Sequence, residues 1–321
     1  MLLASVVIPN YNGKEYLKAC LDSLPKGESY EIIVVDNGSS DGSAAMVEQE
    51  FPGVCLIRND CNEGFDAAVN AGIRKASAEY VILLNNDTTV DESFLQALVD
   101  GLDRHPECFS ASSCMVTMKD PEILDDTGDY YCVLGWAFTL KKGKKRSTRC
   151  REQKCFAACG GASIYRKKVF DRIGLFDENH FAYLEDIDIG FRAQIAGYRN
   201  IYIPEAVCRH VGSGFSGSRY NSFKIKLSAQ NSIYLIYKNM PLLMLLINLP
   251  FLLVGHLVKF VFFLLKGHAG DYLAGIGKGF RLSFSRQGRA KKVPFRWRHL
   301  GQYCRIQWNL WVNLIRRFIN Y

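Results

Sequence analysis

The chain has 321 residues, of which 48% are apolar, so it is long and apolar enough to build a real core in one large domain or in one domain with an appendage. Its formal charge of +8 is unevenly placed: residues 1–218 hold 23 basic against 31 acidic residues, whereas residues 219–321 hold 17 basic residues against one acid, Asp271. This asymmetry indicates a polyanionic partner for the C-terminal part, either a membrane or a nucleic acid.

The eleven cysteines are an odd number and are scattered through apolar and mixed contexts. No signal peptide is expected ahead of the first strand, so we expect reduced, mostly buried thiols in a cytosolic protein. Cys150, Cys155 and Cys159 cluster, but they lack the paired C-x-x-C spacing that is typical of zinc sites.

Strands alternate with short helices in the first third of the chain. Short apolar, β-branched runs predict strands at Ala4–Pro9, Tyr30–Val35, Val54–Ile57 and Val81–Leu84. Apolar spacing and stop signals predict helices at Tyr16–Leu24, Ser43–Glu50, Ala67–Ala76 and from a cap at Asp91 to Pro106. This alternation predicts an α/β fold with a doubly wound, mainly parallel sheet.

A polar turn follows each of these strands. The turns are 10–12, 36–41, 62–64 and 85–87. Right-handed crossovers gather such turns at one edge of the sheet, where open α/β proteins bind ligands. The last turn, Asn85-Asn86-Asp87, offers a lone carboxylate flanked by amides, which suits a divalent cation that also holds phosphate oxygens. No Gly-x-Gly-x-x-Gly follows the first strand, which argues against a dinucleotide dehydrogenase.

The middle of the chain is less regular. Residues 119–158 are predicted to be irregular, with a mobile loop at Lys141–Arg151 that holds seven basic residues. A strand is expected at Phe156–Tyr165, where Gly160-Gly161 permits close backbone approach. A helix then begins with Glu185-Asp186-Ile187-Asp188 and runs to Ala196, and Asp188 is expected to pair with Arg192. Two further strands, Ile201–Pro204 and Ala206–Cys208, lead to His210.

The character of the chain changes at about residue 219. Leu242–Leu265 is nearly continuous apolar sequence that is long enough to span a bilayer. Basic residues and tryptophans interleave beyond it, and a single span would put them on the far side of the membrane from the acidic part, against the positive-inside tendency. We therefore expect helices that lie in, or re-enter, the cytoplasmic leaflet, attached peripherally or monotopically, rather than one span.

Six motifs in order resemble an inverting family-2 glycosyltransferase of the GT-A fold, nearest to rhamnosyltransferase-like members. They are Val7–Asn12, Val35–Gly42, Asn62–Phe65 with Asn70-Ala71-Gly72, Asn85-Asn86-Asp87, Tyr183–Asp188 with Arg192, and Pro204-Glu205-Ala206 with His210. The resemblance covers roughly residues 3–240, and the ordered set is far more specific than any one motif.

The resemblance implies a nucleotide-sugar site. Tyr11 would stack on the donor base beside Pro9, and Asp36 would accept from the base or ribose. The remaining donor contacts implied are Asn12, Gly64, Asn70, Asn86 and Asp87. Asp87 resembles the last acid of a metal-binding D-x-D motif, with His210 as a further metal or pyrophosphate ligand, so Mg²⁺ or Mn²⁺ is implied. Asn85 and Asn86 depart from that motif and leave most of the charge to Asp87.

The resemblance also implies the catalytic acids. Asp186 would be the general base, and the neighbouring acids Glu185 and Asp188 would raise its pKa by like-charge repulsion. Glu185 is the second catalytic candidate. Ala229-Gln230-Asn231 lacks an Arg that related sequences often carry, and Lys224, Lys226 or Lys238 are candidates to replace its phosphate contact.

We therefore expect a GT-A domain at 1–218, with a nucleotide-sugar half at about 1–105 and an acceptor half at about 106–218, and a membrane-associating helical region at 219–321. The expected activity moves a sugar, with rhamnose favoured, from a dTDP- or UDP-linked donor to a lipid-linked glycan acceptor, with inversion, in cell-surface polysaccharide synthesis. The alternatives are a sugar nucleotidyltransferase and a non-catalytic membrane- or nucleic-acid-binding protein; nucleic acid is not the expected partner.

Overall fold

The computed structural model describes residues 2–25, 27, 29–149, 151–212 and 221–319. The strands are β1 (Ala4–Asn10), β2 (Tyr30–Asp36), β3 (Cys55–Arg58), β4 (Tyr80–Leu84), β5 (Thr88–Val90), β6 (Cys108–Thr117), β7 (Leu124–Asp126), β8 (Asp129–Tyr131), β9 (Ala137–Thr139), β10 (Gln153–Cys155), β11 (Ala162–Arg166) and β12 (Arg199–His210). The α-helices are α1 (Lys14–Ser23), α2 (Ser43–Glu50), α3 (Phe65–Lys75), α4 (Phe94–Asp103), α5 (Lys167–Ile173), α6 (Glu185–Ile195), α7 (Ser222–Asn239), α8 (Leu242–Leu265), α9 (Ala269–Phe284), α10 (Arg286–Ala290) and α11 (Leu300–Ile319).

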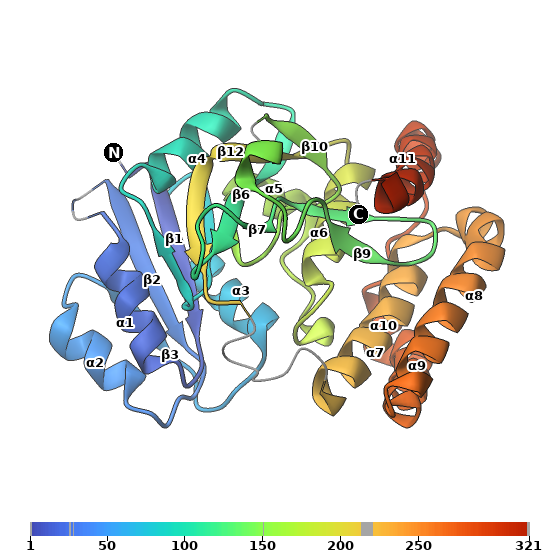
Figure 1. Cartoon of the computed structure of the whole chain (residues 1–321), viewed down its shortest axis with the longest axis horizontal. Coiled ribbons are helices and arrows are strands. Elements are labelled where there is room, and N and C mark those ends of the chain that lie inside the picture. The colour runs from blue at the N-terminus through green and yellow to red at the C-terminus, as the bar shows by residue number, and fades with distance from the viewer. Residues whose placement is uncertain (1, 26, 28, 150, 213–220, 320–321) are drawn as a thin grey trace.

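One large mixed sheet organises the molecule (Figure 1). Its main path runs β10-β12-β6-β11-β4-β1-β2-β3, with β5 on β12 and β7 on β6. β1, β2, β3 and β4 are mutually parallel, β12 is parallel to β6, and β11 runs antiparallel between β4 and β6. The six parallel strands therefore end at the same edge, as the α/β prediction requires.

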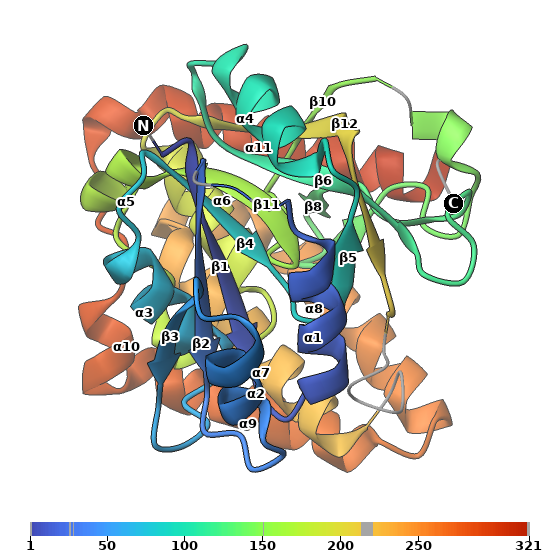
Figure 2. The same cartoon turned by 90° about the vertical axis from the view of Figure 1, so that its left-hand side faces the viewer.

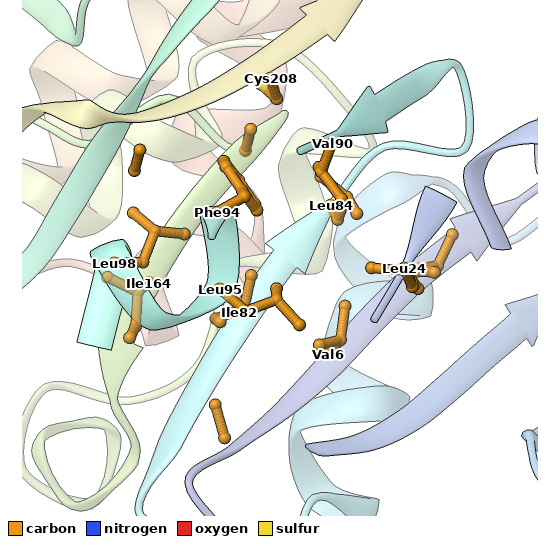
Figure 3. Packing of buried hydrophobic residues seen from close by; sticks show 14 of the residues in the cluster. Val6, Leu24, Ile82, Leu84, Val90, Phe94, Leu95, Leu98, Ile164 and Cys208 are labelled. Atoms are coloured by element: carbon orange, nitrogen blue, oxygen red, sulfur yellow. The ribbon is translucent and has the colours of Figure 1, made fainter. Parts of the chain in front are cut away.

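Helices cover both faces of this sheet, so its strands are buried on both sides. One face packs against α1, α2 and α4, and Figure 3 shows Leu95 of α4 beside Ile82 of β4 and Leu98 of α4 beside Ile164 of β11. The opposite face packs against α3, α5 and α6. Alternate residues of the strands thus contribute to two separate cores, and the sheet edge between them is held rigidly.

The predicted strands and helices up to residue 103 lie within about two residues of the observed ones, but β5 (Thr88–Val90) was not predicted and the later elements also differ. β6 was not predicted, because its buried run includes Ser110, Ser112 and Ser113 and therefore shows no apolar alternation. β12 is one strand with a register shift between Ile203 and Val207, not two strands. Ser93, not Asp91, is the N-cap residue of α4.

The segment from 119 to 158 is more ordered than predicted. It contains β7, β8, β9, β10 and the short 3₁₀ helix η1 (Arg146–Arg149). Most described residues of Lys141–Arg151, predicted as a mobile loop, are exposed, but two of its cations are anchored to the domain: Arg149 is buried and donates to the Tyr130 hydroxyl, and Lys142 pairs with Asp125. Buried partners for these two cations explain the difference; Cys150 lies outside the described residues.

The C-terminal helices stand beside the sheet domain and are packed against it (Figures 1 and 2). A third core joins the two parts. It contains Tyr131, Phe156, Phe191, Leu235, Leu252, Ile306 and Leu310. Because residues from β8 and α6 share this core with α7, α8 and α11, the C-terminal region is part of the folded body.

Candidate active site

Amide and carboxylate side chains from three strand ends meet at the carboxyl edge of the sheet. The Asn10 amide donates to Oδ1 of Asp36 at 2.9 Å, and its own oxygen accepts from the Asn86 amide at 2.7 Å. The second Asp36 oxygen accepts from the backbone N–H of Ser39 at 3.0 Å. Asp36 and Asn86, which belong to separate motifs, are therefore linked through Asn10, a residue that the sequence analysis did not single out.

The remaining residues of the first motif line the same edge. Pro9 and Tyr11 are half-buried, and Asn12 is exposed in a left-handed conformation with φ of 48°. The Asn12 side-chain oxygen accepts from the Ser40 N–H at 2.8 Å, which ties the turn after β1 to the turn after β2. These contacts hold the turn that carries Tyr11 against the turn that follows Asp36.

Gly64 and Asn70 contact the segment that leads to α6. Gly64 has φ of 93°, and a Cβ there would lie 2.6 Å from the carbonyl oxygen and the ring of Phe181, so a larger side chain is excluded. The Asn70 amide donates to the Phe176 carbonyl and to Glu178, and its oxygen accepts from the Phe176 N–H. The structure therefore gives Asn70 a fully satisfied, buried position at which it holds this segment.

Asp87 and His210 are brought together, although 123 positions separate them in the chain. β12 pairs with β5, with His210 opposite Thr88, so His210 Nε2 lies 3.3 Å from Oδ2 of Asp87. The other ring nitrogen, Nδ1, lies 2.6 Å from Oδ2 of Asp125, and Lys142 donates to the second Asp125 oxygen at 2.5 Å. A histidine that ligates a metal through one ring nitrogen commonly donates a hydrogen bond from the other ring nitrogen to a carboxylate. Asp125 is placed to be that carboxylate for His210.

The charges of this group support one another. Burial would lower the pKa of His210, but its hydrogen bonds to Asp125 and Asp87 raise that pKa to about 9. Burial would raise the pKa of Asp125, but His210 and Lys142 lower it to about 2. The 3.3 Å separation between Asp87 and His210 also fits two ligand atoms on one Mg²⁺ or Mn²⁺ ion, whose bonds of about 2.1 Å place adjacent ligands about 3 Å apart. Binding of such an ion to His210 would displace the proton that its ring holds toward Asp87.

A second group of acids lies beside the start of α6. Burial and the charge of Asp186 raise the pKa of Glu185 to about 8. The pKa of Asp186 is also raised, and the main cause is burial rather than the predicted repulsion from its neighbours. Asp129 of β8 is hydrogen-bonded to Asp186, and burial and Asp186 raise its pKa well above its usual range. Burial likewise raises the pKa of Asp66 in α3, whose two carboxylate oxygens have no hydrogen-bond partner.

The loop that presents these acids has an unusual backbone. Phe181, Tyr183 and Leu184 have positive φ values of 63°, 70° and 66°, a strained conformation that non-glycine residues adopt mainly where surrounding contacts impose it. Asn231 of α7 supplies such contacts, because its side-chain amide lies 2.8 Å from the carbonyl oxygens of His180, Ala182 and Tyr183. α7 therefore fixes the position from which Glu185 and Asp186 start α6.

The paired glycines before β11 allow the close approach that the sequence predicted. A Cβ on Gly161 would lie 3.2 Å from the Asn85 side chain, and one on Gly160 would lie 3.7 Å from Glu185. The backbone at 160–161 thus passes between the strand-end turn after β4 and the first acid of α6, and brings both groups to one site.

Asp188 is turned away from this site. The predicted pairing with Arg192 is confirmed at 2.9 Å, and Lys238 of α7 also donates to Asp188 at 2.8 Å. Lys238 in addition pairs with Asp177 at 2.6 Å and is 2% exposed. It is therefore committed to a buried ion cluster and is not available as the phosphate contact considered from the sequence; Lys226 pairs with Asp271.

The sequence analysis missed three acids of the site, Asp125, Asp126 and Asp129. Asp126, Asp129 and Cys159 have ligand atoms within 4.8 Å of one another, so this part of the site also groups metal-binding side-chain types. The run Asp125-Asp126-Thr127-Gly128-Asp129 was a detectable signal, since it holds three acids in five residues. It was overlooked because the whole stretch was interpreted as irregular.

Known proteins resemble this chain in sequence and in fold. The model of the family described as glycosyl transferase family 2 matches residues 5–174. An N-acetylglucosaminyl-diphospho-decaprenol L-rhamnosyltransferase of Mycobacterium tuberculosis is 26% identical over 233 residues, which are 64% of this chain and 75% of the relative. A poly-beta-1,6-N-acetyl-D-glucosamine synthase of Staphylococcus aureus is 26% identical over 206 residues, 62% of this chain and 47% of the synthase, so the chain spans about half of that relative.

Solved structures with 16–17% identity share the fold. The mannosyltransferase PcManGT from Pyrobaculum calidifontis, in complex with GDP-Man and Mn²⁺, has a TM-score of 0.54 over 96% of this chain and 84% of that one. TarS 1–349 of S. aureus, in complex with UDP-GlcNAc, has a TM-score of 0.52 over 95% of this chain and 79% of that one. Since the family model covers more than half of the chain and the sheet has the matching GT-A architecture, the chain belongs to glycosyl transferase family 2.

Proposed function

We propose that this protein transfers a sugar, with rhamnose favoured, from a dTDP- or UDP-linked donor to a lipid-linked glycan acceptor, with inversion. The observation that carries the proposal is the 160–161 backbone, which approaches the Asn85 side chain at Gly161 and Glu185 at Gly160. Asn85 stands two residues before Asp87, which pairs with His210. The rhamnose preference rests on the relative that is named as an L-rhamnosyltransferase acting on N-acetylglucosaminyl-diphospho-decaprenol.

Asp186 is the proposed general base. Its carboxylate takes the proton of the acceptor hydroxyl, the hydroxyl oxygen forms the new bond to the anomeric carbon, and the bond from that carbon to the diphosphate breaks with its electron pair. Attack from the face opposite the diphosphate inverts the anomeric centre. Burial raises the pKa of Asp186, which moves its basicity toward neutral pH, where a base is most effective.

The donor nucleotide is proposed to lie along the sheet edge, with its base beside Tyr11 and Pro9 and with Asp36 and Asn12 near the ribose. Asp87 and His210 would hold Mg²⁺ or Mn²⁺, which supplies positive charge to the departing diphosphate. Asn86 is linked to Asp36 through Asn10, so the nucleotide and metal ends of the proposed site share one network.

We propose that residues 219–321 attach the enzyme to the cytoplasmic face of the membrane without crossing it. By length and composition α8 could span a bilayer. However, Trp136 donates to the Gly255 carbonyl at 3.1 Å, and the side-chain amides of Asn248 and of Gln307 in α11 exchange hydrogen bonds. A helix held along one face by the folded domain cannot also be surrounded by lipid, which supports monotopic attachment.

The opposite face of α8 supplies the apolar surface for this attachment. Its exposed side chains include Leu243, Leu246, Leu253, Leu257 and Leu264, which are 54–68% exposed. An exposed apolar face among basic residues favours an anionic membrane surface over a nucleic acid, whose binding does not require leucines in water.

A donor and acceptor assay tests the activity. A short-chain prenyl-diphospho-N-acetylglucosamine is offered with dTDP-rhamnose, UDP-sugars and GDP-sugars, and release of nucleoside diphosphate and the product anomer are measured. We expect dTDP-rhamnose to react fastest, with inversion, and excess chelator to abolish the reaction. A retained anomeric configuration, or full activity in chelator, would refute the proposed chemistry.

A further inference from the structure

A basic cavity lies apart from the proposed active site. It has a volume of about 600 Å³ and lies between the catalytic part and the segment that joins α10 to α11. Its walls include Arg74 of α3, Arg172 of α5, and Lys291, Arg296 and Arg298 of that segment, and we call these five side chains the basic pocket. The helices α3, α5 and α10 lie on one side of the molecule in Figure 2. Neither Asp87, His210 nor the acids that start α6 line this cavity.

The cavity holds more positive than negative charge. Its described walls also include two carboxylates, Asp177, which pairs with Lys238, and Glu178. Within the described part of the chain, Arg172, Lys291, Arg296 and Arg298 form no ion pair with a carboxylate. Arg74 reaches Glu178 only at 3.9 Å. Arg296, Arg298 and Arg172 come close enough together that, with burial, they lower the pKa of His299 between them. Like charges that converge across a cavity repel one another unless an anion lies among them.

The two walls of the cavity are held in place. The Val293 N–H donates to the Lys238 carbonyl at 2.9 Å, which fixes the 291–298 segment to the end of α7. Arg172 lies over the Tyr198 ring, with 5.5 Å between the guanidinium carbon and the ring centroid. The cations therefore face each other because of the fold. Guanidinium groups in such an arrangement bind phosphate with paired hydrogen bonds.

The aromatic residues of the same segment indicate the source of the phosphate. Phe295 and Trp297 alternate with the two arginines, are 41% and 79% exposed, and contact each other with ring centroids 5.2 Å apart. Exposed tryptophan beside arginine is typical of the headgroup level of a membrane. Trp308 of α11 is also exposed, at 69%.

We propose that the basic pocket binds the phosphate of an anionic lipid headgroup and thereby joins the catalytic part to the membrane surface. This inference rests on the proposed membrane attachment but names a separate site. Arg172 belongs to α5 in the catalytic part, so a headgroup in the pocket would contact both parts of the molecule at once.

The test measures binding of the full chain to vesicles of phosphatidylcholine with and without phosphatidylglycerol. Arg296→Gln with Arg298→Gln should weaken binding to the phosphatidylglycerol vesicles about tenfold or more and leave binding to pure phosphatidylcholine unchanged. The matched control, Arg281→Gln with Arg286→Gln, removes the same charge from exposed positions of α9 and α10 outside the pocket. The control pair should weaken binding to the phosphatidylglycerol vesicles several-fold less than the pocket pair does. Arg172→Gln, on the opposite wall, should weaken phosphatidylglycerol binding like the first pair.

Each of the other possible outcomes would overturn a specific part of the proposal. Equal losses for the pocket pair and the control pair would mean that only general charge attraction acts, and would overturn the proposed site. Calorimetric binding of inorganic phosphate as tight as vesicle binding, and lost in the pocket pair, would identify a free-anion site and overturn the lipid assignment. If the wild-type chain binds neither kind of vesicle, the membrane attachment itself is wrong; if it binds and the pocket pair binds equally, only the pocket inference fails.

Discussion

Neighbouring residues of the chain have opposite electrostatic surroundings at the start of α6. Burial raises the pKa values of Glu185 and Asp186, whereas Arg192 and Lys238 hold the pKa of Asp188 well below its usual range. Successive helical residues point about 100° apart, so one turn of helix faces both the proposed cleft and an ion cluster. This division supports the proposed proton transfer at the first pair of acids and gives Asp188 a structural place in the ion cluster.

The first prediction tests the base. Asp186→Asn keeps the shape of the side chain but cannot take a proton, so sugar transfer should fall about 10²–10⁴-fold. Donor affinity measured by calorimetry should stay near the wild-type value, which separates lost chemistry from misfolding. Glu185→Gln is the matched comparison. An inactive Glu185→Gln beside an active Asp186→Asn would transfer the role of base to Glu185.

The second prediction concerns pH and stability. The pKa of Glu185 rises from 4.5 to about 8 in the folded state because of burial and the charge of Asp186. The folded protein therefore holds a proton that the unfolded chain has released, and the stability that this contributes is lost as the pH rises from about 4.5 through about 8. Glu185→Gln removes this titration, so its melting temperature should fall less than that of wild type between about pH 5 and about pH 9.

The exposed Glu15→Gln of α1 provides the control for that experiment and should follow the wild-type pH dependence. Parallel melting curves for wild type and Glu185→Gln over the whole range would mean that Glu185 is not the titrating group. The measurement needs only thermal unfolding in metal-free buffer, and is independent of the donor and the acceptor.

Helices α6 and α7 are joined by a buried ion cluster. Lys238 of α7 lies between Asp177 and Asp188, and these three side chains are at most 3% exposed. Removing one partner leaves buried charges without compensation, so Lys238→Met should lower the free energy of unfolding by about 3–5 kcal/mol. Lys226→Met breaks a solvent-accessible pair with Asp271 and should destabilise the protein much less than Lys238→Met. Equal effects of the two substitutions in denaturant unfolding would contradict this assignment.

Helix α8 depends on one glycine to reach the sheet domain. A Cβ on Gly255 would lie 2.0 Å from the Leu134 carbonyl oxygen, so Gly255→Ala should separate the two backbones and destabilise the protein by about 1–3 kcal/mol. Gly277 of α9 has no atom within 4 Å of the corresponding position, and Gly277→Ala should be stabilising by up to about 1 kcal/mol. Chemical denaturation distinguishes the two, and a neutral Gly255→Ala would mean that α8 is not docked against Leu134.

At the scale of the whole molecule, charge and apolar surface are segregated, but the core is shared. The sequence alone suggests that deleting residues 242–321 would release the protein from membranes. The same deletion would remove Leu252, Ile306 and Leu310 from the core that covers Tyr131 and Phe156. Membrane attachment is therefore better tested by surface substitutions in the full chain.

The fifth prediction makes that test. Leu246→Gln, Leu253→Gln and Leu257→Gln together remove exposed leucines from α8 without touching its buried stripe. Because burying one leucine contributes about 1.5–3 kcal/mol, the partition into phosphatidylcholine vesicles should fall at least about 100-fold. Leu2→Gln, at the other end of the chain, is the control and should bind like wild type. Unchanged binding of the triple variant would exclude α8 as the membrane-contacting face.

The sequence predicted the features that depend on neighbouring residues. The strands from β1 to β4 could be identified because their apolar runs are local, and each ends in a polar turn whose side chains meet at the sheet edge. The Asp188–Arg192 pair was predictable for the same reason, since four residues of helix bring the two side chains together. The family resemblance implied functional roles for the residues of these turns, but it did not predict which side chains contact one another.

The tertiary structure decided everything that depends on contacts between distant segments. β6 is buried by its neighbours in spite of its serines. Lys142 meets Asp125 because the backbone at 143–144 is hydrogen-bonded to Leu124. The hydrogen bond between Asp129 and Asp186 also joins distant segments, and the stretch that contains Asp129 has no regular apolar period in its sequence. The residue pattern of a segment predicts the periodicity of one helix or strand. Burial and charge pairing depend instead on which strands and helices are neighbours in the fold, and no single segment of the sequence determines that order.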